Sequence, residues 1–418
     1  MSSERPCADD YVIASHPIFT RDMGVLAHEL LFRRCTNDEC AAIACCDDAT
    51  NAMIADGFAL ATGRLGKESL LSVNVGIDNI LSRSVRALPP ERVLLEVPGN
   101  VPAGEKFLGV CAELRAAGYR FVVDGYDPGA NGAAALAALA SYVKIPVAGA
   151  DGKAVARVRQ SLAGHGCGLI ASRVESWEAF EGCKFLGFDY FQGFFFAYPR
   201  EIVGKKLSSH KLSQLRLQRL LVDKDADMAH IVDVISMDQA LTIRLLHFVN
   251  SAAFSMGSRV DSLARAAALI GLKTLRKWAM TAILADADAS ERGQELSYRT
   301  LHSAVFLSLL GDRLPPGGPD ADTLYLLGLL HNVDAVMGLK MQDIIDEMPL
   351  MAVVRKALMR DGDEPLARFI LLVDAIWRND WATAQGYLQT LGVPLPVAAK
   401  AYMQAGVVTE QMQAALAS

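Results

Sequence analysis

The sequence predicts two structural halves, an α/β half followed by an all-helical half. Short apolar runs of strand length alternate with helical segments up to about residue 200, and no convincing strand run follows residue 204. The chain has 418 residues, of which 52% are hydrophobic and 21% are charged, which is enough for two domains with cores of their own. A largely disordered chain is therefore excluded.

The first half contains strand-like runs rich in Val, Ile and Leu. Several of them lack polar alternation, which favours parallel strands that are covered on both faces. The runs lie at residues 70–75, 92–97, 120–126, 142–147 and 168–174. Helical segments lie between them, for example at residues 106–118 and 133–142. The repeated strand–helix–strand order predicts either a (β/α) barrel or a doubly wound sheet.

The second half carries long helical patterns. One of them, residues 228–251, is expected to break just before Asp238, which can cap a second helix. The Pro- and Gly-rich residues 315–319 predict a loop between two further helices. The change in character places the boundary between residues 200 and 208, so the expected domains are residues 1–203 and 204–418.

The charge and hydropathy patterns limit the classes of partner. There are 41 Lys and Arg residues against 47 Asp and Glu residues, and a net charge of -6 gives no general attraction to nucleic acid or anionic lipid. No stretch reaches the ~20 apolar residues of a spanning helix. The first residues lack the apolar run of a signal peptide. We therefore expect a cytoplasmic protein that does not contact membranes.

Polar residues at the expected strand ends suggest an active site, because parallel barrels place their sites at the C-terminal ends of the strands. These residues are Glu29, Asn74, Glu96, Asp124, Lys144 and Glu175. Carboxylates hold hard divalent ions, the ions activate a water, and a lysine can orient or deprotonate that water. The set suits a metal-dependent phosphodiesterase. Helix capping by the same acids is the alternative.

Seven separated motifs resemble the EAL domain, the family of bacterial phosphodiesterases of cyclic di-GMP, over roughly residues 10–203. They are VLAHELLFR around Glu29, SVNV around Asn74, LLEV around Glu96, VVDGY around Asp124, VKIP around Lys144, ASRVES around Glu175 and FDYFQGFFFAYP around Gln192. The resemblance implies a modified TIM-type barrel that binds cyclic di-GMP across the strand ends. Active members of the family hold two Mg²⁺ or Mn²⁺ ions.

The resemblance also implies a role for each matched residue. Arg33 falls on a phosphate-contacting arginine, Lys144 on the catalytic lysine, and Gln192 on a glutamine of the site. The positions of metal ligands are taken by Glu29, Asn74, Glu96 and Asp124. Arg33 and Gln192 are therefore the candidates for binding a ligand without metals.

Two acids of the family pattern are missing. Gly125 replaces the second acid after Asp124, and Ser172 replaces a glutamate of which only the companion Glu175 remains. A two-ion site works only when both ions are held at a fixed separation. Losing one side chain that supports a metal ligand typically costs ~10–100-fold in affinity or activity. We therefore expect no catalytic residue, with Lys144 and Glu175 vestigial, and no cofactor unless weak Mg or Mn binding survives.

The helical half resembles the HDOD domain, a non-catalytic relative of the HD phosphohydrolases, over about residues 208–400. The segments that carry the resemblance are residues 237–254, 262–278 and 325–334. An HD metal site needs a His-Asp pair, whereas this sequence has His331-Asn332, and an amide is a far poorer ligand than a carboxylate. His302 falls on an upstream metal histidine of HD enzymes. Both histidines are expected to be hydrogen-bonded core residues.

Residues 262–278 also suggest a helix–Gly turn–helix reader of DNA, with Lys273, Arg276 and Lys277 on its second helix. Leu and Trp side chains share that helix and leave only a narrow basic face. Core packing is therefore favoured, and a nucleic-acid partner is not expected.

Two hypotheses about function follow. In the first, the protein is a non-catalytic bacterial signal-transduction regulator that acts through protein–protein interaction, and sensing of cyclic di-GMP by the barrel is left open. In the second, it is a weak metal-dependent phosphodiesterase of cyclic di-GMP. The missing acids at Gly125 and Ser172 favour the first. A protein partner is expected, and a homodimer is left open. Residues 206–221 are the candidate docking helix between the domains, and an ordinary core helix of the second domain is the equal alternative.

Overall fold

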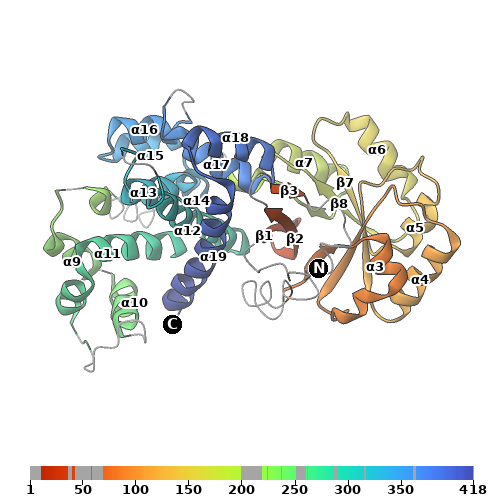
Figure 1. Cartoon of the computed structure of the whole chain (residues 1–418), viewed down its shortest axis with the longest axis horizontal. Helices are drawn as coiled ribbons and strands as arrows, with labels where there is room; N and C mark the ends of the chain where they lie inside the picture. The colour runs from red at the N-terminus through yellow and green to blue at the C-terminus, as the bar shows by residue number, and fades with distance from the viewer. Residues whose placement is uncertain are drawn as a thin grey trace, which may run out of the picture. The chain divides into compact units, whose positions relative to one another are not determined.

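The computed structural model divides into two compact units (Figure 1), and every structural statement below concerns its described residues alone. These are residues 11–35, 40–42, 58, 69–198, 219–223, 225–236, 238–250, 260, 262–286, 288, 290–314, 317–360 and 364–417. Unit 1 comprises Met1–Phe196, Trp377–Trp381 and Leu395–Lys400, and unit 2 comprises Ala197–Ile376, Ala382–Pro394 and Ala401–Ser418. The predicted boundary at 203/204 and most of the candidate docking helix lie outside the described residues, so both stay predictions.

Unit 1 contains a closed barrel in which β1 pairs with both β2 and β9 and so closes the ring. The ring consists of β1 (Tyr11–Thr20), β2 (Val25–Cys35), β4 (Leu71–Asn74), β5 (Val93–Pro98), β6 (Arg120–Asp124), β7 (Tyr142–Pro146), β8 (Gly168–Ser172) and β9 (Tyr190–Phe191). Only the two pairings of β1 are antiparallel within the ring. A short strand β3 (Cys40–Ala42) pairs with β2 outside it.

Helices surround this barrel on the outside (Figure 1). They are α3 (Ile77–Ser82), α4 (Glu105–Ala116), α5 (Ala133–Leu139), α6 (Gly152–Ser161) and α7 (Trp177–Phe185). Because both faces of the strands are covered, the strands read as continuous apolar runs, as their sequences indicated. The barrel prediction is confirmed. The alternative of a doubly wound sheet is wrong, because the pairing of β1 with β2 leaves no open edge in the ring.

The interior of the barrel is packed by a layer of apolar side chains, which we call the apolar layer. It consists of Ile18, Ala27, Leu94, Val122 and Ile170, against which Tyr142 and Tyr190 pack. Alternate residues along a strand share one face, so the residues two positions further along these strands also point inward. The side chains two positions after the members of the apolar layer therefore form the next layer inside the barrel.

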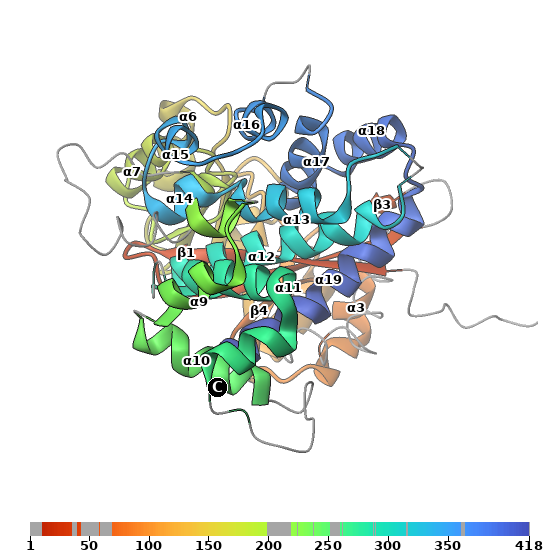
Figure 2. The ribbon, with the colours of Figure 1, turned by 90° about the vertical axis from the view of Figure 1, so that its left-hand side faces the viewer.

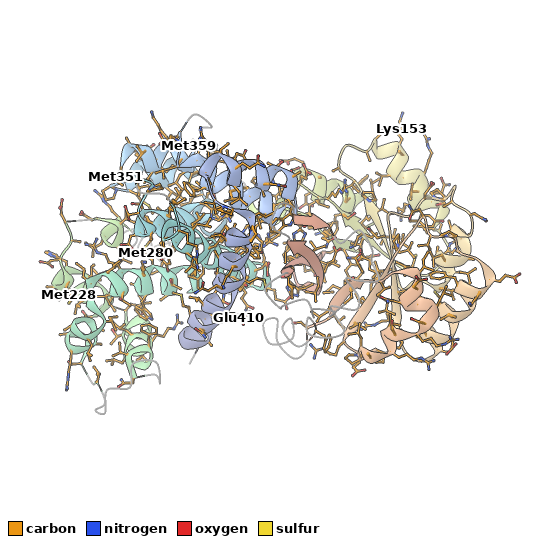
Figure 3. The ribbon with its side chains drawn as sticks, in the orientation of Figure 1. Lys153, Met228, Met280, Met351, Met359 and Glu410 are labelled. Carbon is orange, nitrogen blue, oxygen red and sulfur yellow. The ribbon has the colours of Figure 1, made fainter. Side chains whose placement is uncertain are left out.

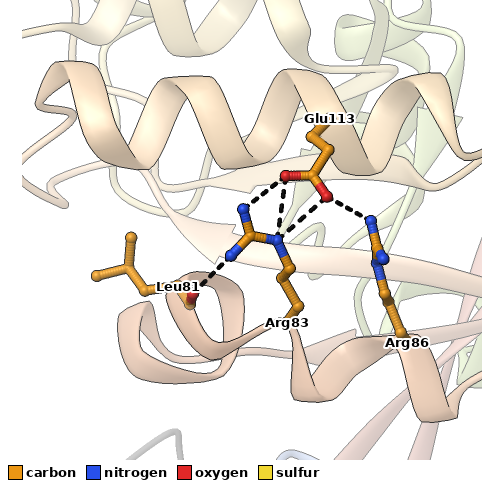
Figure 4. Close-up of polar contacts among 4 residues, drawn as sticks. All are labelled: Leu81, Arg83, Arg86 and Glu113. Carbon is orange, nitrogen blue, oxygen red and sulfur yellow. Dashed lines mark hydrogen bonds and ion pairs between the residues drawn. The ribbon is translucent and has the colours of Figure 1, made fainter.

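On the outside of the barrel, two arginines converge on one glutamate of α4 (Figure 4). The single N–H at Arg83 Nε is shared between both carboxylate oxygens of Glu113, at 3.1 and 3.0 Å, Nη2 donates to Oε2 at 2.6 Å, and Arg86 donates a further bond. Arg83 has a positive φ of 63° and connects α3 to the short 3-10 helix Ser84–Ala87. Because the three side chains are exposed, their ion pairs contribute little to stability.

Unit 2 is helical throughout its described residues, which confirms the all-helical prediction (Figure 2). The helices are α9 (Met228–Ser236), α10 (Gln239–Asn250), α11 (Leu263–Asp286), α12 (Glu291–Gly311), α13 (Ala321–Leu330), α14 (Val333–Met337), α15 (Met341–Glu347), α16 (Ala352–Leu358), α17 (Ala367–Trp377), α18 (Trp381–Leu391) and α19 (Leu395–Ala417). The last residue of α17, the first of α18 and the first six of α19 are assigned to unit 1. The predicted break before Asp238 is present, and Asp238 accepts a hydrogen bond from the Leu241 amide at 3.1 Å. Across the described part of the chain, no helix is long and apolar enough to cross a membrane.

The centre of unit 2 is α12, which is buried along most of its length. It packs against α13 at Gly328, where a Cβ atom would lie only 2.6 Å from the Cα of Ala304. Such a distance is far shorter than any normal contact between carbon atoms. The absence of a side chain at Gly328 therefore allows the two helix backbones to approach closely.

Candidate functional site

A layer of polar side chains, which we call the polar layer, lies inside the barrel next to the apolar layer. Its members are Glu29 on β2, Ser72 and Asn74 on β4, Glu96 on β5, Asp124 on β6, Lys144 on β7, Ser172 on β8 and Gln192 directly after β9. Glu96, for example, follows Leu94 of the apolar layer by two residues and therefore shares its face of β5. The layer brings together six of the predicted site residues, namely Glu29, Asn74, Glu96, Asp124, Lys144 and Gln192.

The prediction that these residues lie at strand ends is right for Asn74 and Asp124, the last residues of β4 and β6, but needs a correction for three others. Glu29, Glu96 and Lys144 lie within their strands rather than at the ends. Their side chains are buried because the barrel interior encloses them on all sides. The acids therefore meet inside the barrel, where water screens their charges less than at an open mouth.

Lys144 is held between two carboxylates of the polar layer. Its Nζ lies 3.0 Å from Glu29 Oε2 and 2.5 Å from Glu96 Oε1. Only 3% of the Lys144 side chain is exposed. A buried ammonium ion is tolerated only when it is paired and hydrogen-bonded, and the two acids supply both conditions.

The remaining carboxylate oxygens are also bound by side chains of the protein. Asn74 Nδ2 donates to Glu29 Oε1 at 3.1 Å, and Gln192 Nε2 donates to Glu29 Oε2 at 2.7 Å. Ser72 Oγ donates to Glu96 Oε2 at 2.8 Å. Each of the four carboxylate oxygens of Glu29 and Glu96 therefore accepts at least one hydrogen bond from a side chain.

The two buried glutamates differ in pKa. Burial opposes ionisation of Glu29, but Lys144, Asn74 and Gln192 lower the pKa of this carboxyl to about 2. For Glu96, burial and the charge of Glu29 outweigh Lys144 and raise the pKa to about 7. The two carboxyls therefore differ in direction: the contacts of Glu29 favour its ionised form, whereas burial and the charge of Glu29 oppose ionisation of Glu96.

The polar layer in this arrangement does not fit the two metal ions that the resemblance implies. Divalent ions would have to displace Lys144 from Glu29 and Glu96, whose oxygens are all engaged. Among the described residues, no group of three or more His, Cys, Asp or Glu side chains is placed to hold a metal ion. We therefore derive no catalytic step through a metal.

Other predicted site residues lie outside this network. Glu175 is exposed and follows the end of β8, while the backbone of Arg33 is part of β2 but its side chain is not described. Gly125 has a φ of 64°, and no atom lies within 4 Å of where its Cβ would be. The structure therefore leaves open space at the position of the first missing acid.

Sequence reasoning overlooked Ser72, which holds the second oxygen of Glu96. The information was present in the strand pattern, because Ser72 precedes Asn74 by two residues and shares its face of β4. A small hydroxyl side chain within a largely apolar strand was the feature of the sequence that could have identified Ser72 as part of the site.

The two histidines of the helical unit each have a local hydrogen bond. His302 Nε2 lies 3.1 Å from the carbonyl oxygen of Tyr402, and His331 Nδ1 lies 2.8 Å from the carbonyl oxygen of Gly328. Both rings are buried. The pKa of His331 is lowered by burial, so this imidazole is neutral at physiological pH. These contacts are those of packed core residues.

A buried acid close in sequence to His331 gives a testable pH dependence. Burial raises the pKa of Asp334 from 3.8 to about 6. Between these values the folded state binds more protons than the unfolded state, so the stability contributed by this group falls as pH rises. Asp334→Asn should therefore raise the unfolding free energy by about 1–3 kcal/mol at pH 7.5 and leave it nearly unchanged at pH 4. Denaturant unfolding at both pH values measures this, and an equal effect at both would contradict it.

The alternative of a DNA-reading face receives no support from the geometry. Gly271, with φ 77° and ψ 159°, interrupts α11, so the predicted turn is present. However, Lys273 and Lys277 both pair with Asp322, at 2.5 and 2.9 Å. Arg276 donates to a backbone carbonyl of the same unit. Asp322 offsets the charge of the two lysines, and Arg276 is bound within unit 2, although the Lys273 side chain is 70% exposed.

The described residues thus form a closed barrel with one antiparallel strand and a polar interior layer. The same chain also has an all-helical unit. Residues 64–199 match the EAL domain, and residues 208–357 match the HDOD domain. The chain therefore combines a region that matches the EAL domain with a region that matches the HDOD domain.

Two relatives are similar over most of their length. The uncharacterized protein YuxH of Bacillus subtilis is 26% identical over 378 residues, which cover 89% of this chain and 91% of YuxH. The cyclic di-GMP phosphodiesterase CdgJ of Vibrio cholerae is 26% identical over 389 residues, which cover 92% of this chain and 88% of CdgJ. Among solved structures, Klebsiella pneumoniae BlrP1 with calcium and cyclic di-GMP matches 46% of this chain and 57% of its own, with 22% identity and a TM-score of 0.37.

Proposed function

We propose that this chain is a cytoplasmic signalling protein that binds cyclic di-GMP in its barrel without efficient hydrolysis and acts on a protein partner. The EAL domain match and the similarity to CdgJ, which is named as a cyclic di-GMP phosphodiesterase, support the nucleotide. The observation that carries the non-catalytic part is the ammonium group of Lys144 between Glu29 and Glu96.

This arrangement explains why binding without hydrolysis is reasonable. Hydrolysis of a phosphodiester by metal ions needs an activated water, which the ions supply. Here Lys144 compensates the charge of the acids, and Ser172 and Gly125 offer no carboxylate. Lys144 and the raised pKa of Glu96 also reduce the negative charge of the polar layer at neutral pH. An anionic ligand is therefore repelled less than it would be by bare carboxylates.

A protein partner is supported by exposed apolar side chains on unit 2. Met351, Val353 and Met359 lie on or beside α16 and are 42%, 43% and 48% exposed (Figure 3 labels the two methionines). Exposed apolar side chains can take part in binding a partner, and flexible methionine side chains adapt to a partner surface. We include the region of α16 in the proposed function as the one that contacts the partner.

The test is calorimetric titration of the whole chain with cyclic di-GMP in the presence of EDTA. We expect saturable binding that Arg33→Ala weakens about tenfold or more, because arginine binds phosphate oxygens through charge-assisted hydrogen bonds. Arg86→Ala, on the outside of the barrel, is the matched control and should bind as the wild type does. With Mn²⁺ we expect turnover below about 0.01 s⁻¹, against the ~1–10³ s⁻¹ of ordinary enzymes. Turnover near 1 s⁻¹ would refute the non-catalytic proposal.

A slow metal-dependent phosphodiesterase is the second candidate, and the name of CdgJ favours it. The two candidates differ in the effect of metal. In the second, linear product forms in the presence of Mn²⁺ in proportion to protein, whereas in the first the product stays at background with and without Mn²⁺. Mass spectrometry of the product distinguishes them.

A further inference from the structure

Arg173 lies at the C-terminal end of β8, directly after Ser172 of the polar layer. Strands β4 to β8 run parallel, so Asn74 and Asp124 end their strands at this same end of the barrel. Parallel barrels bind their ligands at this end. The sequence motifs gave no role to Arg173, although its side chain carries a permanent positive charge beside the candidate site.

The backbone of Arg173 has a conformation that disfavours an arginine. Its φ of 58° lies in the left-handed region, which is uncommon for residues other than glycine. Hydrogen bonds fix the main chain on both sides. The Ser172 carbonyl oxygen accepts one from the Val147 amide at 2.9 Å, and the amide that follows Arg173, that of Val174, donates to the Gln192 carbonyl oxygen at 3.0 Å. Strained backbone of this kind occurs preferentially at sites that bind ligands.

The guanidinium group of Arg173 is accessible to a ligand. The residue is exposed, and within the described part of the chain its side chain makes no hydrogen bond or ion pair. Its charge nevertheless acts on the polar layer, because burial raises the pKa of Asp124, whereas Lys144 and, to a smaller extent, Arg173 lower it. Lys144 is bound to Glu29 and Glu96, with only 3% of its side chain exposed. Of these two cations, Arg173 is therefore the one that a ligand can reach.

We propose that Arg173 binds a phosphate group of the ligand at the C-terminal end of the barrel and determines a preference for a phosphodiester anion. A guanidinium group binds two phosphate oxygens through a planar pair of charge-assisted hydrogen bonds. In a two-ion site, metal ions supply the positive charge that faces the phosphate. Here Arg173 supplies part of it, because the two glutamates already offset the charge of Lys144. The inference rests on the proposed function and adds to it a residue that allows binding without metal ions.

The test compares two variants that remove the guanidinium group but differ in their effect on the backbone. Arg173→Gly relieves the left-handed conformation, whereas Arg173→Gln keeps a long side chain and the strain. The whole chain is titrated with cyclic di-GMP in EDTA by calorimetry. We expect both variants to bind about tenfold more weakly than the wild type. Added salt should weaken the binding of the wild type more than that of either variant, because salt screens the lost charge.

Arg83→Gly is the matched control. It also replaces an exposed arginine with a positive φ, here 63°, but on the outside of the barrel, and it should bind as the wild type does. Thermal melting separates binding from folding. Arg173→Gly should melt at or above the temperature of the wild type, because glycine adopts the left-handed conformation without strain.

The outcomes distinguish this inference from the proposed function. If the wild type binds and both Arg173 variants bind equally well, the inference is overturned while the proposed function stands. It is also overturned if only one of the two variants weakens binding, since the backbone or the side-chain length would then be responsible, or if Arg83→Gly weakens binding as much. If the wild type does not bind cyclic di-GMP, the proposed function fails and this inference fails with it.

Discussion

Replacing Lys144 by Met is expected to destabilise unit 1 by about 3–5 kcal/mol at pH 7, because breaking a buried ion pair leaves the remaining charge without compensation. Lys144 is the cation that contacts both Glu29 and Glu96, and all three side chains are almost fully removed from solvent. The loss should be smaller at pH 5, since in the variant the two carboxyls take up protons more readily. Denaturant unfolding at both pH values measures the effect.

The matched control breaks an ion pair of the same kind at the surface of the same barrel. Arg83→Met removes the contacts with Glu113, which are exposed, and should change the stability little. Adding Glu29→Gln to Lys144→Met should recover part of the loss, because only one buried acid then lacks its cation. If Lys144→Met lowers the free energy of unfolding no more than Arg83→Met does, the ion pairs of Lys144 with Glu29 and Glu96 do not stabilise the barrel as described.

The second large effect is expected at the contact between α12 and α13. Gly328→Ala places a Cβ atom 2.6 Å from both the Cα and the backbone nitrogen of Ala304. Backbone atoms cannot move aside as a flexible side chain can, so the two helices must separate. We expect a loss of about 2–3 kcal/mol, which is typical of overpacking, measured by denaturant unfolding.

Gly386→Ala is the control for this substitution. Gly386 also lies inside a helix, α18, but nothing lies within 4 Å of its Cβ position. Since alanine is a better helix former than glycine, this variant should be stabilised by about 0.5–1 kcal/mol. If the two alanine variants have equal stability, the close packing at Gly328 has been misjudged.

Most of the barrel could be predicted because its parallel strands are continuous apolar runs. The predicted runs left out β2 as well as β1 and β9. Strand β1 contains His16 and Pro17 and pairs antiparallel with both its neighbours, whereas β9 has only two residues. Neither gives the periodic signal on which strand prediction relies. The ring closes through these two strands. Because the sequence did not predict them, it could not exclude a doubly wound sheet.

The candidate site was predictable in its composition but not in its contacts. Glu29, Glu96 and Lys144 were selected as polar residues of strands, and the barrel does bring them together. Their pairing joins residues 115 and 48 positions apart, which no local pattern encodes. The position of Lys144 between the acids therefore required the closed ring. The exposed position of Glu175 likewise depends on where β8 ends.

The two layers inside the barrel have a consequence for evolution. The apolar layer packs the interior through residues such as Leu94 and Val122, while the polar layer occupies alternate positions of the same strands. Substitutions in the polar layer can therefore change what the barrel recognises or catalyses without removing the packing that folds it. Such substitutions are tolerated only when each buried charge keeps a partner of opposite charge, as Glu29 and Glu96 keep Lys144 here. A lineage of such barrels can exchange one chemistry for another while the scaffold persists.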